Sequence, residues 1–336
     1  MGDDMWMPDV PPTLGDALSF HLQPYPVVPA VCVVLLALYA LAVASARRQG
    51  TRWPMSRSVW WLTGIVSIAL TTATAVDGFG MESFGIHMLQ HMVLNMLSPL
   101  LLVLGCPVSL VFWALPHGAA SRIFSRRTLL RVLGSRVARA LTHPLVVGAA
   151  FLFSLYGIYF TVWFTPLMNT AAGHNTMLLM FLATGYLYFW SALGVDLGPR
   201  RVGRGHRGRL YLNVVELAIP MPIHSFFGVV VMMSATVIVP FFSMPMYPWI
   251  PDALADQGAA GGIAWGFTAV PTLIALAVIL GVAGNATKSR NPGRSEEHEL
   301  EEYNAYLASW NEGDRWTRTD PQTVTHTASP SPGENG

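Results

Sequence analysis

The sequence carries little charge: 12% of its 336 residues are Asp, Glu, Lys or Arg, against about 25% in an ordinary soluble domain. Hydrophobic residues make up 52%, and the mean hydropathy is +0.44. So low a charge in so apolar a chain excludes an ordinary soluble globular protein. We therefore expect most of the chain to lie in a lipid bilayer.

Cysteine and lysine are almost absent. Cys32 and Cys106 form no CxxC pair and no disulfide framework, so metal chemistry would rest on His, Met and carboxylates. The single lysine, Lys288, lies beyond the last apolar stretch, which excludes a retinal Schiff base inside a bundle. No phosphate-binding loop, dinucleotide fingerprint or HExxH pattern is present, and we expect no enzyme.

Apolar stretches long enough to cross a bilayer occur seven times; a crossing helix needs about 20 mostly apolar residues. The expected fold is therefore all-α, a bundle of seven transmembrane helices. Pro220 and Pro222 predict a kink or tilt in the sixth. The stretches are residues 27–46, 59–76, 84–104, 143–164, 171–193, 210–239 and 263–284.

The basic residues predict the orientation, because Lys and Arg collect in cytoplasmic loops. Every one of the 20 lies in loop 47–58, 115–142 or 194–209, or after the seventh stretch. The segments expected on the opposite side of the membrane contain no Lys or Arg. This pattern predicts an extracellular N-terminus and a cytoplasmic C-terminus.

The expected organisation has three parts: an extracellular segment 1–26, a membrane domain 27–287 and a cytoplasmic tail 288–336. In the tail, residues 296–310 resemble a short acidic amphipathic helix, and the Ser-, Thr-, Pro- and Gly-rich remainder is typical of disorder. The arginine loops are explained by topology and by anionic lipid headgroups, so we expect lipid and not nucleic acid as their partner.

A polar stripe interrupts the third apolar stretch. His87 and His91 are four residues apart and share a helix face, which continues through Asn95 and Ser98. Such a stripe is expected to face the bundle interior. The neighbouring stripe contains Met88, Met92 and Met96, although methionines in an apolar protein mostly serve packing.

Two further polar residues are expected at the depth of His87 and His91: His174, on the fifth stretch, and Asp77, after the second. Several imidazoles with a carboxylate and nearby thioethers suit copper, and thioethers favour Cu(I). We predict a copper site of His87, His91 and His174, with Asp77 as a weak ligand or a partner of the imidazoles. Weaker candidates are His224, Met88, Met92 and Met177.

A structural role is the alternative for each of these residues. Membrane histidines also hydrogen-bond across helices, which stabilises a bundle by about 1 kcal/mol. His224, expected nearer mid-membrane, suits that role equally well, and Asp77 could cap a helix. Glu216 could belong to a proton path or pair with the polar patch around Asn213.

Residues 87–107, HMLQHMVLNMLSPLLLVLGCP, resemble the signature of the CtaG family of caa3-type cytochrome c oxidase assembly proteins. That signature is HMxQH, an apolar run and a Pro…GxP exit. The stretch DQGAAGGIAW is similar to the family's DQxxxGxxxW motif at the entry to the last span. The YNAYLA stretch of the tail (303–308) also resembles sequences of this family. The matching residues are His87, Met88, Gln90, His91, Pro99, Gly105, Pro107, Asp256, Gln257, Gly261 and Trp265.

The resemblance implies a multi-pass protein of the bacterial plasma membrane that helps assemble haem-copper oxidase, with oxidase subunits as partners and copper as cargo. Two alternatives stay open. A haem-binding electron carrier would use histidines on separate helices, but His87 and His91 share one face, so only one of them could pair with His174. A metal-free scaffold for oxidase subunits is the other.

Overall fold

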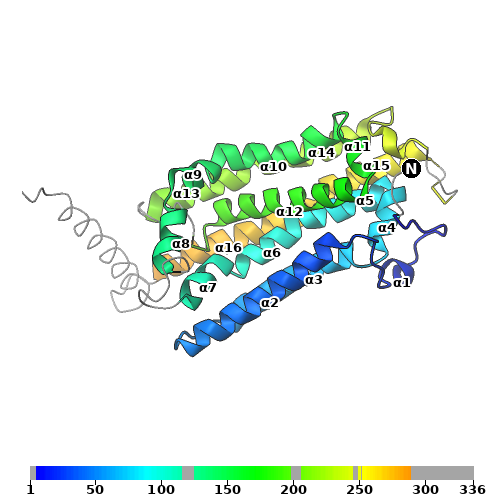
Figure 1. Ribbon diagram of the computed structural model, residues 1–336. Coiled ribbons are helices and arrows are strands. Elements are labelled where there is room, and N and C mark those ends of the chain that lie inside the picture. Colours follow the sequence, from blue (N-terminus) through cyan, green and yellow to red (C-terminus); the bar gives the residue numbers. More distant parts are fainter. Residues whose placement is uncertain (1–4, 116–124, 198–205, 245–248, 251, 289–336) are drawn as a thin grey trace, which may run out of the picture. The chain divides into compact units, whose positions relative to one another are not determined.

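The structure is a computed structural model, which describes the chain outside residues 1–4, 116–124, 198–205, 245–248, 251 and 289–336 (Figure 1). For residues 206–211 and 282–288 the structure describes the backbone but not the side chains. The chain divides into two compact units, residues 1–283 and 284–336. The second lies almost wholly outside the described residues, and so does the helix expected at 296–310.

In the described residues of the first unit, helices are the regular secondary structure, and an isolated β-bridge joins Phe20 to Thr74. The α-helices are α1 Leu14–Ala17, α2 Val27–Arg48, α3 Met55–Thr72, α4 Val76–Glu82, α5 Phe84–Met92, α6 Ser98–Leu104, α7 Pro107–Ala114, α8 Arg126–Leu133, α9 Arg136–Leu141, α10 Pro144–Tyr159, α11 Phe164–Met168, α12 Ala171–Leu193, α13 His206–Ala218, α14 Pro220–Met233, α15 Ala253–Phe267 and α16 Ala269–Lys288. A π-helix, η1 Val93–Leu97, joins α5 to α6, and a 3₁₀ turn, η2 Pro240–Phe242, follows α14.

Five helical segments in the described part are long and apolar enough to cross a membrane: Val27–Arg48, Phe84–Ala114, Ala171–Leu193, Leu212–Met233 and Ala253–Gly281. A shorter apolar helix covers Pro144–Tyr159. These segments confirm an all-helical membrane protein. The remaining expected span, 59–76, overlaps α3, an 18-residue helix.

Two boundaries differ from expectation for identifiable reasons. The third span was expected to end at residue 104, but the helical segment continues to Ala114 because α7 starts at Pro107 after a left-handed Cys106 (φ 48°). The seventh was expected to start at 263, but α15 begins ten residues earlier, with Asp252 as its N-cap. Polar Asp256 and Gln257 suggested a loop there, but both bind backbone groups of neighbouring segments.

The prolines act as predicted in the sixth span. Helix α13 ends at Ala218 and α14 begins at Pro220, since a proline inside a helix lacks the N–H donor and clashes with the preceding turn. Helix α14 then packs along α15, and the two lie side by side in Figure 1.

The α14–α15 contact depends on glycine. A Cβ atom on Gly261 would lie 2.3 Å from the backbone nitrogen of Met232, and one on Gly228 would lie 2.4 Å from that of Trp265. Small residues at helix crossings allow such close backbone approach in membrane proteins. Because α15 also packs against α5, this crossing helps to position the histidine-bearing helix.

Gly261→Ala should therefore lower the thermal unfolding midpoint of the detergent-solubilised protein, since overpacking of this kind costs about 1–3 kcal/mol. Gly258→Ala on the same helix is the matched control, because a Cβ there meets nothing within 4 Å. Equal midpoints for the two variants would contradict the close crossing.

Candidate metal centre

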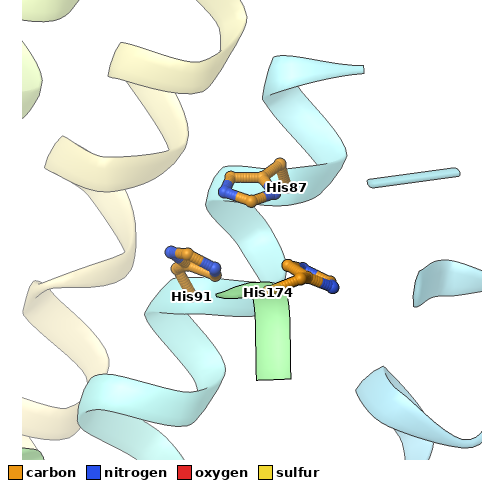
Figure 2. Close-up of side chains that lie close together, drawn as sticks. All are labelled: His87, His91 and His174. Carbon is orange, nitrogen blue, oxygen red and sulfur yellow. The ribbon is translucent and has the colours of Figure 1, made fainter. Parts of the chain in front are cut away.

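Three histidines gather between α5 and α12 (Figure 2). His87 and His91 are one turn apart on α5, with ring centroids separated by 4.0 Å, and His174 comes from the first turn of α12 with its centroid 6.0 Å from that of His87. One ligand nitrogen from each ring lies within 4.8 Å of the other two. The sequence expectation placed these three residues at one depth, and the structure brings them together.

All three imidazoles are buried and incompletely hydrogen-bonded. His87 and His91 are 0% exposed and His174 is 3% exposed. Among the described residues, Nε2 of His91 and Nε2 of His174 have no hydrogen-bond partner, and the His87 ring has a backbone group of Gly80 beside it. Buried polar atoms are nearly always satisfied in folded proteins. The three rings therefore present nitrogen atoms of the kind that can bind a metal ion.

Helix α5 is held at its N-terminus by another helix. The Asp256 carboxylate of α15 accepts hydrogen bonds from the backbone N–H groups of Phe84 (2.6 Å) and Gly85 (3.1 Å) and from the Ser83 hydroxyl (2.9 Å). Ser83 is also the N-cap, accepting from Ile86 N. The first turn of α5, which carries His87, is thus fixed by a carboxylate at the positive end of the helix.

Tyr159 orients His91 and was not anticipated from the sequence. Its hydroxyl lies 2.8 Å from His91 Nδ1, and the residue is 2% exposed at the last position of α10. One available signal was its place at the outer end of the fourth span, level with the histidines. The bond leaves His91 Nε2 directed away from the tyrosine.

Aromatic side chains enclose the cluster. The rings of Phe164 and Phe242 lie with centroids 5.4 and 5.5 Å from that of His87, and Phe181 lies 4.2 Å from His91. All three phenylalanines are buried. This lining keeps water from the ring nitrogens and leaves no flat slot beside His87.

Asp77 lies beside His174 but outside the group of three nitrogens. It belongs to the short helix α4, and its carboxylate accepts a 2.6 Å hydrogen bond from Gln90 Nε2, which also donates to Thr71 O. Burial raises the pKa of Asp77, while nearby His174 and the Gln90 bond act in the opposite direction. Gln90, a residue of the HMxQH motif, therefore supports Asp77.

His224 lies outside the group of three histidines, and the methionines are part of the hydrophobic core. His224 Nε2 lies 3.4 Å from the Met92 sulfur, and its ring stacks on Phe151. Met88 and Met177 pack in the hydrophobic core, as does Met96. The geometry therefore favours packing and hydrogen bonding for His224 and Met92 over membership of the histidine site.

The remaining stripe residues face the interior, as predicted: Asn95 and Ser98 are 0% exposed. The Ser98 hydroxyl bonds that of Ser67 at 2.7 Å, and Asn95 Oδ1 accepts from Thr184 at 3.4 Å. Asn95 lies in the π-helix directly below His91, a type of irregularity that is frequent at functional sites.

A family model described as cytochrome c oxidase caa3 assembly factor (Caa3_CtaG) matches residues 37–282, which include the histidine cluster and the Asp256 clamp. The chain belongs to this family. The resemblance seen in the HMxQH and DQ motifs is thereby confirmed.

Mycobacterial proteins are similar over most of the chain. Uncharacterized protein Mb0105 of Mycobacterium bovis is 37% identical over 307 residues, 88% of this chain and 45% of its own length. Uncharacterized protein ML1998 of Mycobacterium leprae is 36% identical over 253 residues, 75% and 38% respectively. The chain spans less than half the length of these relatives. No solved structure matches it significantly.

Asp256→Ala should destabilise the protein and loosen the start of α5, because three donors lose their acceptor; losing a helix cap alone costs about 0.5–2 kcal/mol. Thermal unfolding in detergent measures the effect, with exposed Asp9→Ala as the control. An unchanged midpoint in Asp256→Ala would show that the carboxylate does not hold the helix.

Proposed function

We propose that this protein is an assembly factor for cytochrome c oxidase in the bacterial plasma membrane, which holds copper at His87, His91 and His174 and hands it to an oxidase subunit. The observation that carries the proposal is the set of three buried imidazole nitrogens, contributed by two helices, within 4.8 Å of one another. Membership of the family supports the role in oxidase assembly, and the mycobacterial relatives support a bacterial membrane.

The donor set suits Cu(I). Imidazole is a good ligand for copper, and three neutral nitrogens provide trigonal coordination. Because the Born cost of burying an ion rises with the square of its charge, a monovalent ion is better tolerated than a divalent one in this apolar lining. The Asp77 carboxyl group lies beside His174 and, when ionised, would offset part of the charge.

Tyr159 acts on the tautomer of His91. For His91 Nε2 to offer its lone pair to the metal, Nδ1 carries the proton and donates it to the Tyr159 oxygen, 2.8 Å away. The hydrogen bond thus aims the free nitrogen toward His87 and His174. To release the copper, each bond from the ion to one of these nitrogens is replaced in turn by a bond to a ligand on the receiving subunit.

The orientation proposed with this function has seven spans, the N-terminus outside and the C-terminus in the cytoplasm. The distribution of basic residues supports it. It places the first turns of α5 and α12, and so the histidines, near the outer face of the membrane. Copper for that site would arrive from, and leave toward, the outer side.

The packing argues against the haem-carrier alternative. A b-type haem needs two axial histidines with a flat slot between them wide enough for the porphyrin. Here His91 lies 4.0 Å from His87, and Phe164 and Phe242 occupy the space beside that ring. An optical spectrum of the purified protein lacking a Soret band is the result that the copper proposal requires.

Copper content is the direct test. After loading with Cu(I) under anaerobic conditions, the wild-type protein should retain about one ion per chain, and His87→Ala, His91→Ala and His174→Ala should retain much less. His224→Ala is the matched control, since His224 is equally buried but bonds Met92. Equal, near-zero copper in every variant and in the wild type would leave only a metal-free scaffold.

Cysteine labelling tests the topology. Three expected crossings separate Ser56 from Asn169, both exposed, so an impermeant maleimide should label Asn169→Cys in intact cells and Ser56→Cys only after permeabilisation. Replacing the two buried native cysteines by alanine provides the background. If both positions were labelled from the same side, α3 would not cross the membrane. If the labelling pattern were reversed, the N-terminus would lie in the cytoplasm.

A further inference from the structure

The segment before α2 is folded against the outer ends of the helices (Figure 1). Trp6 and Gln23 bond each other reciprocally, Trp6 N to Gln23 Oε1 at 2.9 Å and Gln23 Nε2 to Trp6 O at 3.0 Å. The Trp6 ring stacks on His21 and lies so close to Gly78 of α4 that a Cβ there would be 2.5 Å from it. Residues 5–36 precede the part matched by the family model.

Further hydrogen bonds attach the same segment to its neighbours. His21 N donates to Ala73 O, and Ala75 N donates to Ser19 O. On the other side, Asn175 of α12 donates its amide N–H to Tyr25 O at 3.1 Å. The segment is therefore fixed to both α4 and α12, the elements that carry Asp77 and His174.

A small recess remains where the segment meets these helices. Its lining contains Met5, Gln23, Asp77, His174 and Asn175, and the other lining residues are Thr72, residues at the start of α2 and before it, and apolar residues of α12. His174 therefore has two environments: one nitrogen belongs to the three-histidine cluster, and its ring also lines the recess.

His174 is the member of the cluster with exposed surface, 3% against 0% for His87 and His91. The two histidines of α5 are closed off by phenylalanine rings. Of the three cluster histidines, His174 is the one that lines this recess.

We propose that this recess is the loading site of the protein: Met5 and Asp77 receive Cu(I) from the outer side and pass it to His174, from which it reaches His87 and His91. The inference rests on the proposed function and names its entry route. Met5, Asp77 and His174 line the same recess, and a thioether, a carboxylate and an imidazole are ligand types that can pass Cu(I) from one to the next.

The transfer is a ligand exchange with no change of oxidation state. Contacts from copper to the Met5 sulfur and the Asp77 oxygen break as the bond to the His174 nitrogen forms. No electron is transferred. Met5 thus affects how fast the cluster fills and leaves the final amount of bound copper unchanged.

The test follows Cu(I) loading by stopped flow, with the coloured Cu(I)–bicinchoninate complex as donor to the full-length protein in detergent. Met5→Leu should load about tenfold more slowly than wild type and reach the same final copper content, a rate effect equivalent to about 1.4 kcal/mol on the barrier. Met7→Leu is the matched control, since Met7 is also partly buried against the core but does not line the recess.

A second experiment controls for an effect of the substitution on folding. Met5→Cys is folded first and then alkylated with N-ethylmaleimide, which should slow loading relative to the same protein before alkylation, whereas alkylated Met7→Cys should load normally. Cys32 and Cys106 are buried and are replaced by alanine in both.

The possible outcomes separate the two proposals. Equal loading rates for Met5→Leu and Met7→Leu, with normal copper content, would overturn the loading site and leave the histidine site standing. A lower final copper content in Met5→Leu would also overturn it, by making Met5 a ligand of the holding site. Failure of the wild-type protein to take up any copper would overturn both.

Discussion

Three buried imidazoles in an apolar interior, contributed by two helices, are the feature around which the neighbouring contacts are arranged. An unsatisfied polar group in a bilayer costs free energy that the folded state must recover elsewhere. The surroundings of the cluster are rigid: a tyrosine holds one ring, phenylalanines close two, and a carboxylate fixes the helix that carries two. These contacts would pre-organise the three rings for the metal site that we propose.

The long segment Phe84–Ala114 is held at two points by carboxylates from elsewhere in the chain. Asp256 binds the start of α5, and Asp196 binds the start of α7 by accepting from Val108 N (2.9 Å) and from Ser109 N (2.7 Å) and its hydroxyl. Burial raises the pKa of Asp196, and these hydrogen bonds act against that rise. The two clamps fix the segment along its length, so that His87 and His91 are positioned by contacts at both ends.

Much of the fold was predictable because lipid allows few solutions. Hydropathy and the arginine loops located the helices, and the spacing of His87 and His91 placed them on one inward face. The convergence of His174 on that face followed from comparing depths along the spans.

The details of contact were not predictable. Tyr159 reaches His91 only because α10 ends beside α5, and Asp256 belongs to a helix that was expected to be a loop. The Met stripe suggested sulfur ligands, but the side chains of Met88 and Met92 point into the core and toward His224. The sequence predicts which face of a helix turns inward. The rotation and tilt of the helix, which decide the residues that this face contacts, depend on packing and are not predicted by the sequence.

The account is tested most directly by X-ray absorption spectroscopy of the protein loaded with Cu(I). It predicts a copper ion surrounded by three imidazole nitrogens from His87, His91 and His174, with the outer-shell scattering of their rings and no sulfur neighbour. A spectrum dominated by sulfur ligands would contradict it and would move the site to the methionines.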